Sequence, residues 1–206
     1  MLLVGLTGNI ASGKSTVARL LVARGATLVD ADVLARRAVE PGTAAHRAIV
    51  ARWGTAVLDP SGALDRAALR RVVFGDPAEL EALNAIVHPE VERLSRDAFA
   101  DARARGDRIV VYDVPLLFER GLAHTFDRII VVDAPPELRL ERLQRDRALD
   151  RDEAARMIAA QMPAEPKRAR ADFVIENAGT REALEARVDE VWRALDREAG
   201  ETTPRP

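Results

Sequence analysis

Residues 5–16 read GLTGNIASGKST, and this stretch decides the fold. From Gly8 to Ser15 it matches the pattern of a glycine, any four residues, then glycine, lysine and a hydroxyl residue, which is typical of a phosphate-binding loop. An apolar run, LLVGL at residues 2–6, precedes the loop, and a helical pattern over residues 14–24 follows it. Strand, loop and helix in this order are the context in which the pattern binds phosphate.

The chemistry of such a loop gives each part a task. Successive backbone N–H groups form an anion-binding nest, and the N-terminus of the following helix adds positive dipole. Lys14 reaches the outer phosphates of a nucleotide, and Ser15 can ligate Mg²⁺. Lys14 and Lys167 are the only lysines among 31 basic residues. A lysine in so arginine-rich a chain indicates a place where a compact ammonium is needed and a planar guanidinium does not fit.

Four more short apolar runs predict the rest of a sheet, at residues 26–29, 108–112, 128–132 and 173–175. The last three are continuous rather than alternating, which is typical of parallel strands covered on both faces. Helical patterns separate the runs. The sequence therefore predicts a doubly wound α/β fold with a five-stranded parallel sheet, whose ligands gather at the strand ends.

Two helical excursions interrupt this pattern within a single domain that spans residues 1–206. Residues 136–170 form a charged helical segment with a capping signal at Asp150, and a last helix capped by Thr180 covers about residues 181–197. We expect a disordered tail over residues 200–206. The other excursion is a helical insertion, residues 33–106, broken by turn signals at Pro41-Gly42, Pro60-Ser61-Gly62, Asp76-Pro77 and His88-Pro89.

Composition excludes several classes of protein. With 48% hydrophobic and 31% charged residues, the 206-residue chain has the apolar mass for a core and is not a disordered chain. The absence of cysteine excludes a disulfide framework, and apolar runs of only a few residues exclude a membrane span. The start of the sequence has no basic flank before its apolar run, so we expect no secretory signal and a cytoplasmic location. A net charge of −2 argues against a nucleic-acid partner.

Aspartates follow three of the predicted strands. Asp30 and Asp32 end the second one, where a carboxylate beside a phosphate loop can accept a proton from a substrate hydroxyl or hold a metal-bound water. Both could instead cap the next helix. For Asp30 the two interpretations are equally good, and for Asp32 we favour catalysis. Asp113 and Asp133 end two later strands, and either can orient Mg²⁺ or serve as a cap or turn residue.

Arginines recur through residues 136–170. Arg139, Arg142 and Arg145 are spaced by three residues and so lie along one face of a helix, with Arg147 and Arg151 beyond them. For most of them a solvated face is the better interpretation, and one or two can close over a transferring phosphoryl group. The three histidines are far apart without ligand spacing, so no zinc site is predicted, and His88-Pro89 is expected to be a turn.

Seven segments resemble the dephospho-CoA kinase family, and they occur in the order found in that family. They are GLTGNIASGKST (5–16), VDADVLAR (29–36), VEPG (39–42), GALDRAAL (62–69), LNAIVHPEV (83–91), VPLLFE (114–119) and ADFVIENAG (171–179). The resemblance implies a phosphate-loop kinase that uses ATP and Mg²⁺ to phosphorylate the ribose 3′-hydroxyl of dephospho-CoA. It also implies that residues 33–106 bind this acceptor and that residues 136–170 are a lid.

The resemblance implies roles for single residues as well. Asp32 would be the general base, Lys14 and Arg142 would act on the transferring phosphate, and Ser15 would hold the metal. The acceptor side would comprise Asp32, Arg36, His88, Pro115, Leu116, Leu117 and Glu119. The nucleotide side would comprise Gly8, Asn9, Ile10, Ala11, Ser12, Gly13, Lys14, Ser15 and Thr16 of the loop, a second lid arginine, and Asn177 and Gly179 near adenine.

Three positions depart from the family pattern. Asn9 and Ala11 stand where glycine is common. Asp146 stands where the family has a second lid arginine, four residues after Arg142. For this second role we favour Arg145, which shares a helical face with Arg142, and Arg147 is the alternative.

Two other functions stay open at this point. Another small-molecule kinase of the same fold would share the phosphate loop. A nucleotide-binding switch would also share it, although the guanine-reading Asn-Lys-x-Asp motif expected of a GTP switch is absent from the sequence. The sequence does not assign an oligomeric state.

Overall fold

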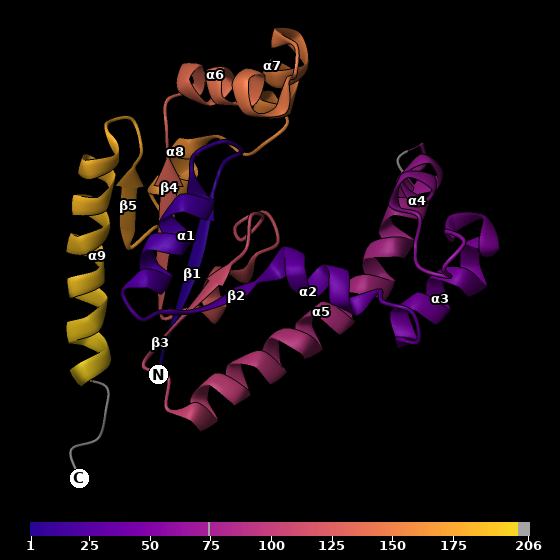
Figure 1. Cartoon of the computed structure of the whole chain (residues 1–206), viewed down its shortest axis with the longest axis horizontal. Helices are drawn as coiled ribbons and strands as arrows, with labels where there is room; N and C mark the ends of the chain where they lie inside the picture. Colours follow the sequence, from indigo (N-terminus) through magenta and orange to yellow (C-terminus); the bar gives the residue numbers. More distant parts are fainter. Residues whose placement is uncertain (74, 202–206) are drawn as a thin grey trace. The chain divides into compact units, whose positions relative to one another are not determined.

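The computed structural model describes residues 1–73 and 75–201. The chain divides into two compact units. The sheet unit consists of Met1–Val29 and the chain from Ala102 onward, and the helical unit consists of Asp30–Asp101. Figure 1 shows the strands in the first unit and only helices in the second. Each unit has its own apolar cluster.

The sheet has five strands in the order β2-β3-β1-β4-β5 (Figure 1). They are β1 (Leu2–Gly8), β2 (Thr27–Asp30), β3 (Ile109–Asp113), β4 (Arg128–Asp133) and β5 (Phe173–Glu176). β1 pairs in parallel with both β3 and β4, and β4 pairs in parallel with β5. The predicted doubly wound α/β fold is confirmed. Register places Asp113 opposite Leu6 and Val132 opposite Gly8, so the ends of β3 and β4 flank the start of the phosphate loop.

The sheet unit also contains helices. They are α1 (Lys14–Ala23), α6 (Pro136–Arg147), α7 (Arg151–Ala159), α8 (Ala164–Arg168) and α9 (Arg181–Glu201), with a 3-10 turn at Leu122–Thr125. The apolar side chains of α1 and α9 pack with those of β1, β3, β4 and β5 in one cluster, in which Val4, Leu6, Val17, Leu21 and Leu195 are completely buried. Burial of these apolar surfaces is the main contribution to the stability of the unit.

Helix ends in this unit follow the sequence signals. Asp150 caps α7 by accepting from the Glu153 N–H, and Thr180 Oγ1 accepts from the Ala183 N–H in the first turn of α9. The expected disordered tail is wrong for residues 200 and 201, because α9 continues through Gly200 to Glu201. Ala199 is buried in the core cluster, which stabilises the last turn. Residues 202–206 of the expected tail lie outside the described residues.

The helical unit contains α2 (Ala31–Ala38), α3 (Ala44–Trp53), a 3-10 turn (Thr55–Val57), α4 (Arg66–Val73) and most of α5 (Pro77–Arg105). Its cluster is built on Ile49, Val57, Leu69 and Val73. Three of the four expected breaks separate these helices. The fourth is wrong, since His88 and Pro89 lie inside α5. Proline removes one backbone hydrogen bond, and Leu83, Ile86 and Val87 of the same helix pack on the cluster and hold it in place.

Among the described residues, no helix combines the length and the apolar character that crossing a membrane requires.

Candidate active site

The phosphate loop leaves β1 at Gly8 and enters α1 at Lys14. Two of its glycines are required by close approach. A Cβ at Gly8 would overlap the Val132 carbonyl oxygen, and one at Gly13 would overlap the Asn177 side-chain amide. Gly13 also has a φ of 92°, in the left-handed region that favours glycine. At Gly8 the loop lies tightly against the end of β4, and at Gly13 it lies tightly against the residue that follows β5. The first turn of α1 begins directly after Gly13.

Ala11 adopts a φ of 59°, which is unusual for a residue with a Cβ. Glycine is common at this position in the family that the sequence resembles. The left-handed backbone explains why glycine is preferred there, and it shows that this chain folds the loop at some cost in strain.

Lys14 forms an ion pair with Asp113 at the end of β3. Both side chains are largely buried, at 16% and 7% exposed. A buried carboxylate is tolerated when it is paired with a cation, and the cation here is Lys14 of the phosphate loop. The structure thus brings together two of the residues that the sequence singled out separately.

Asp133, the other candidate for orienting a metal, has different partners. Its carboxylate accepts from Arg168 at 2.8 Å and from the Ala134 N–H at 2.9 Å. Arg168 also donates to Glu176 at 2.7 Å, so its guanidinium bridges the neighbouring ends of β4 and β5. Asp133 therefore serves to join two strand ends, and Asp113 is the acid beside the loop lysine.

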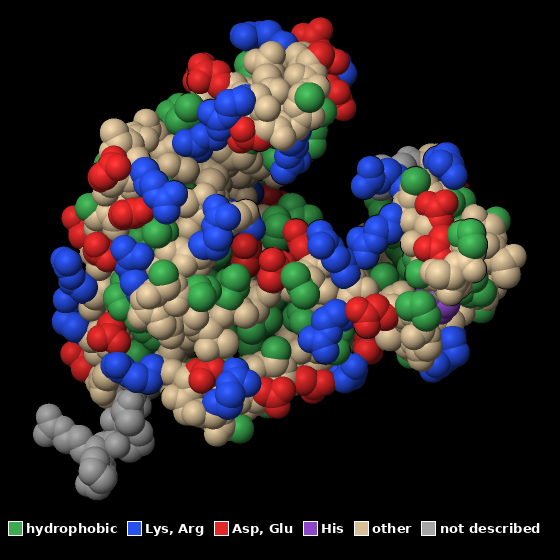
Figure 2. Space-filling view, viewed as in Figure 1, with side chains coloured by type: hydrophobic (Ala, Val, Ile, Leu, Met, Phe, Trp, Pro, Cys, Tyr) green, Lys and Arg blue, Asp and Glu red, His purple; other side chains and the backbone are tan. Residues whose placement is uncertain are grey.

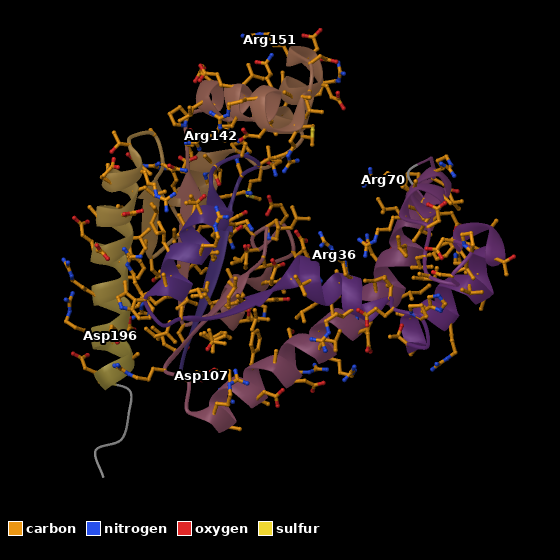
Figure 3. All side chains as sticks on the ribbon, viewed as in Figure 1. Arg36, Arg70, Asp107, Arg142, Arg151 and Asp196 are labelled. Carbon is orange, nitrogen blue, oxygen red and sulfur yellow. The ribbon has the colours of Figure 1, made fainter. Side chains whose placement is uncertain are left out.

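The guanidinium of Arg142, on α6, contacts the phosphate loop (Figure 3). Its guanidinium donates to the carbonyls of Ala11 (3.1 Å), Ser12 (3.3 Å) and Asn177 (2.9 Å). The Asn177 amide donates in turn to the Ser12 carbonyl at 2.8 Å. Burial, and next the positive charge of Arg145, lowers the pKa of the Arg142 guanidinium from its usual value. Arg142 is therefore part of the loop's framework and not a free surface cation.

The other arginines of residues 136–170, hereafter the lid segment, differ from one another. Arg139 is buried, at 4% exposed, and donates to the Ala134 carbonyl, so the solvated face that was favoured for most of these arginines does not include it. Arg145 is exposed and forms a two-point ion pair with Asp146, whose carboxylate raises the pKa of the guanidinium. Arg147 and Arg151 are exposed as well. Figure 2 shows basic and acidic side chains intermingled over the helices of this segment.

The end of the lid segment is hydrogen-bonded to the start of the phosphate loop. Gln161 Oε1 accepts from the Ile10 N–H at 2.7 Å, and the Asn9 side-chain amide donates to the Met162 carbonyl at 3.1 Å. A cavity of about 400 Å³ lies beside these contacts, between the ends of β4 and β5 and the chain that follows α7. Sequence reasoning missed Gln161, because a lone glutamine in a polar helical segment carries no pattern.

The segment Pro115–Glu119 follows β3 in the same unit. The Pro115 carbonyl accepts from Thr7 Oγ1 at 3.0 Å, and Leu117 is completely buried where a Cβ on Gly5 would overlap it. Leu116 is 47% exposed. Glu119 Oε1 lies 2.7 Å from Lys167 Nζ. The segment is thus fixed along β1 while one apolar side chain points to solvent.

Four predicted residues belong to the helical unit. Asp30 caps α2 by accepting from the N–H groups of Asp32 and Val33, which gives the structural interpretation of this residue direct support. Asp32 is exposed in the first turn of α2. Arg36 is exposed one turn later on the same face, and His88 lies half-buried on α5.

A parallel sheet in the order β2-β3-β1-β4-β5, with a phosphate loop after its central strand, defines a kinase-like protein of the phosphate-loop class. Shikimate kinase from Acinetobacter baumannii has this fold, with 16% identity, coverage of 96% of this chain and 94% of that one, and a TM-score of 0.51. The family model for dephospho-CoA kinase matches residues 2–182. The chain belongs to the dephospho-CoA kinase family.

Individual relatives agree with this assignment. The dephospho-CoA kinase of Thermobifida fusca is 51% identical over 197 residues, which cover 96% of this chain and 98% of that protein. The dephospho-CoA kinase of Anaeromyxobacter dehalogenans is 49% identical over 204 residues, covering 99% and 97%. A crystal structure of the protein TT1252 from Thermus thermophilus is 41% identical and covers 98% of both chains, with a TM-score of 0.79.

Proposed function

We propose that this protein transfers the γ-phosphoryl group of ATP to the 3′-hydroxyl of the ribose of dephospho-CoA, giving coenzyme A and ADP. The observation that carries the proposal is the phosphate loop Gly8–Ser15 at the end of the central strand, in a chain whose residues 2–182 match the family. The small-molecule substrates fit a cytoplasmic enzyme that needs neither nucleic acid nor membrane.

The nucleotide binds on the sheet unit. Its phosphates lie against the N–H groups of residues 11–16, with Lys14 at the β- and γ-phosphates. Adenine lies near Asn177 and Gly179. The tight approach of Gly13 to the Asn177 amide supports this placement, because it joins the phosphate loop to the chain that follows β5. Gly8, Asn9 and Ile10 shape the start of the loop, and Asn9 and Ile10 fix it to the lid segment.

Mg²⁺ suits the oxygen atoms available beside the loop. The Ser15 hydroxyl, exposed in the first turn of α1, would hold the ion, and Asp113 would orient it. The chemistry of this donor set fits, since Mg²⁺ prefers a few hard oxygen ligands and completes its shell with phosphates and water. Bound Mg²⁺ would neutralise charge that develops on the β- and γ-phosphates. The partners of Asp133 at the strand ends favour Asp113 for this task.

In the helical unit, Asp32, Arg36 and His88 are assigned to the acceptor. In the sheet unit, the segment Pro115–Glu119 is assigned to it, with Pro115, Leu116 and Glu119 as the accessible residues and Leu117 buried beneath them. Asp32 accepts the proton of the 3′-hydroxyl while the oxygen of that hydroxyl attacks the γ-phosphorus. The bond from the γ-phosphorus to the oxygen that bridges to the β-phosphate breaks in the same displacement, and ADP leaves with that oxygen. The exposure of Asp32 and Arg36 on one face of α2 supports their access to a substrate.

Arg142 contacts the ATP phosphates in this proposal, and Arg145 is the second lid arginine. The contacts of Arg142 with the Ala11 and Ser12 carbonyls support its place beside the phosphates. Arg145 is held by Asp146 at 2.7 Å and would exchange this partner for a phosphate oxygen. Arg147 remains the alternative.

The test is ADP release by the purified protein with ATP and Mg²⁺ on addition of dephospho-CoA, with mass spectrometry of the product. Nucleoside monophosphates and shikimate serve as competing acceptors. We expect rapid ADP release only with dephospho-CoA and a product that is coenzyme A. Faster turnover of another acceptor would identify a different kinase of this fold, and nucleotide binding without any turnover would favour a conformational switch.

A further inference from the structure

Lys167 is the second of the two lysines, and it is buried in the sheet unit. Its side chain is 1% exposed, on the short helix α8 at the end of the lid segment. Nζ lies 2.7 Å from Glu119 Oε1, and within residues 1–73 and 75–201 Nζ donates no well-directed hydrogen bond. A buried ammonium is costly unless it is paired, so Glu119 is the group that makes this position tolerable.

The two partners differ in their access to solvent. Glu119 is 23% exposed, and its carboxylate has a second oxygen that Lys167 does not contact at this distance. Lys167 is covered. A substrate that reaches the segment Pro115–Glu119 can therefore touch Glu119 but not Lys167, so any effect of Lys167 on the substrate must act through Glu119.

A second contact joins the same two parts of the chain. The Arg170 guanidinium lies over the ring of Phe118, 4.6 Å from its centroid, and Phe118 is 4% exposed. Arg170 follows Lys167 by three residues, and Phe118 precedes Glu119. Two cations at the end of the lid segment thus hold two consecutive residues of the segment after β3. Such a cation–π contact adds to the ion pair without sharing its partner.

The same stretch of the lid segment also reaches the phosphate loop. Gln161 binds the Ile10 N–H six residues before Lys167. Residues 161–170 therefore contact the loop that receives ATP at one end and the segment Pro115–Glu119 at the other.

We propose that Lys167 is a positioning residue for the acceptor, which fixes the Glu119 carboxylate and, with Arg170, sets the segment Pro115–Glu119 in its binding conformation. The inference rests on the proposed function, in which this segment binds dephospho-CoA. Lysine is required because the covered space beside Glu119 admits a compact ammonium, whereas a guanidinium is larger and planar.

The test compares steady-state kinetics, with each substrate varied in turn, and thermal unfolding of four variants. Lys167→Met removes the ammonium and keeps the length of the side chain. Lys167→Met combined with Glu119→Gln removes both charges. Arg170→Gln changes an exposed residue, so this variant folds in any case. Arg24→Met is the matched control, because Arg24 forms a 2.6 Å ion pair with Asp189 between α1 and α9, away from both substrates.

We expect Lys167→Met to raise the KM for dephospho-CoA about tenfold, as for the loss of one charge-assisted contact, with the KM for ATP within about twofold of wild type. Arg170→Gln should raise the same KM about threefold. The double variant should keep the raised acceptor KM, since neither charge is left to set the segment. Arg24→Met should lower the melting temperature without changing either KM.

Three results would each overturn the inference and leave Lys167 with a role in stability alone. They are equal changes in both KM values for Lys167→Met, an unchanged acceptor KM in Arg170→Gln, and recovery of the acceptor KM in the double variant. The wild-type assay separates this from a failure of the proposed function. If wild-type protein released no ADP on addition of dephospho-CoA, both would fall together.

Discussion

Lys14 and Asp113, 99 positions apart in the chain, form an ion pair at the carboxyl end of the sheet. The pairing holds the ammonium at the phosphate loop before any phosphate is bound. In the proposed mechanism, the phosphates of a nucleotide would compete with Asp113 for the lysine, and the carboxylate would then be free to orient a metal ion.

Replacement of Lys14 tests this arrangement. Lys14→Met removes the cation and leaves the backbone nest, so we expect turnover to fall by at least about 10²-fold. Lys14→Arg should not restore it, because a planar guanidinium does not fit beside Asp113. Circular dichroism would verify that both variants fold. Near wild-type turnover of Lys14→Arg would refute the argument from arginine-rich composition.

The two acids at the start of α2 should respond differently to substitution. Asp32→Asn removes the proposed general base, and we expect kcat to fall by roughly 10²–10⁴-fold with little change in ATP binding. Asp30→Asn keeps an oxygen that can accept from the Asp32 and Val33 N–H groups, so kcat and stability should change little. Equal losses of kcat in the two variants would contradict the assignment of the base to Asp32.

Arg142 should contribute to stability as well as to turnover. As a surface lid residue it would be expected to leave ligand-free stability unchanged when replaced. Its three bonds to backbone carbonyls predict otherwise, and we expect Arg142→Ala to lower the free energy of unfolding by about 1–3 kcal/mol along with kcat/KM. Urea unfolding without ligands measures the first effect. Arg145→Ala is the control for stability, since its ion pair with Asp146 is exposed.

Strain in the phosphate loop predicts a stabilising substitution. Ala11→Gly relieves a left-handed alanine, a gain of roughly 1–2 kcal/mol, against roughly 0.4–1 kcal/mol for the extra freedom of glycine in the unfolded chain. We expect the free energy of unfolding to rise, by up to about 1.6 kcal/mol. Gly13→Ala should lower it, because φ is 92° there and the new methyl group would overlap Asn177. A loss of stability in Ala11→Gly would argue against strain at this position.

The helical unit should lose stability in acid through Glu79. Hydrogen bonds from Arg52 and Trp53 hold the pKa of this carboxyl below its usual value of 4.5. Because the folded-state pKa is lowered, the contribution of Glu79 to the free energy of unfolding is complete above pH 4.5. It is lost as the pH falls through the folded-state pKa. The indole N–H resonance of Trp53, which donates to Glu79, should shift over that lower range. Glu79→Gln should abolish the shift, and a shift that persists would assign it to another group.

Local signals in the sequence predicted most of the fold. Continuous apolar runs located the strands. Strands that are buried on both faces carry apolar residues at successive positions, without alternating polar residues, so each run stands out in the sequence. Asp150 and Thr180 marked helix starts through capping, which depends on neighbouring residues only. The phosphate loop could be recognised for the same reason.

Features that depend on distant parts of the chain were not predictable. The helix through Pro89 survives because its apolar residues pack on a cluster formed by other helices. Arg139 is buried and Arg145 is exposed. Six residues turn an α-helix by about 600°, so these two side chains point about 120° apart, and their spacing does not reveal which of them is covered. The contact of Gln161 with Ile10 joins positions 151 residues apart.

Each of the two compact units contains one of the two tryptophans in the sequence. Trp53 packs against the cluster of the helical unit, and Trp192 packs against that of the sheet unit. Their indoles are natural fluorescent reporters of unfolding. Trp53→Phe leaves Trp192 to report the sheet unit, and Trp192→Phe leaves Trp53 to report the helical unit. Units with separate cores can open at different temperatures, and the two emission curves then report cooperativity between them without any dye or label.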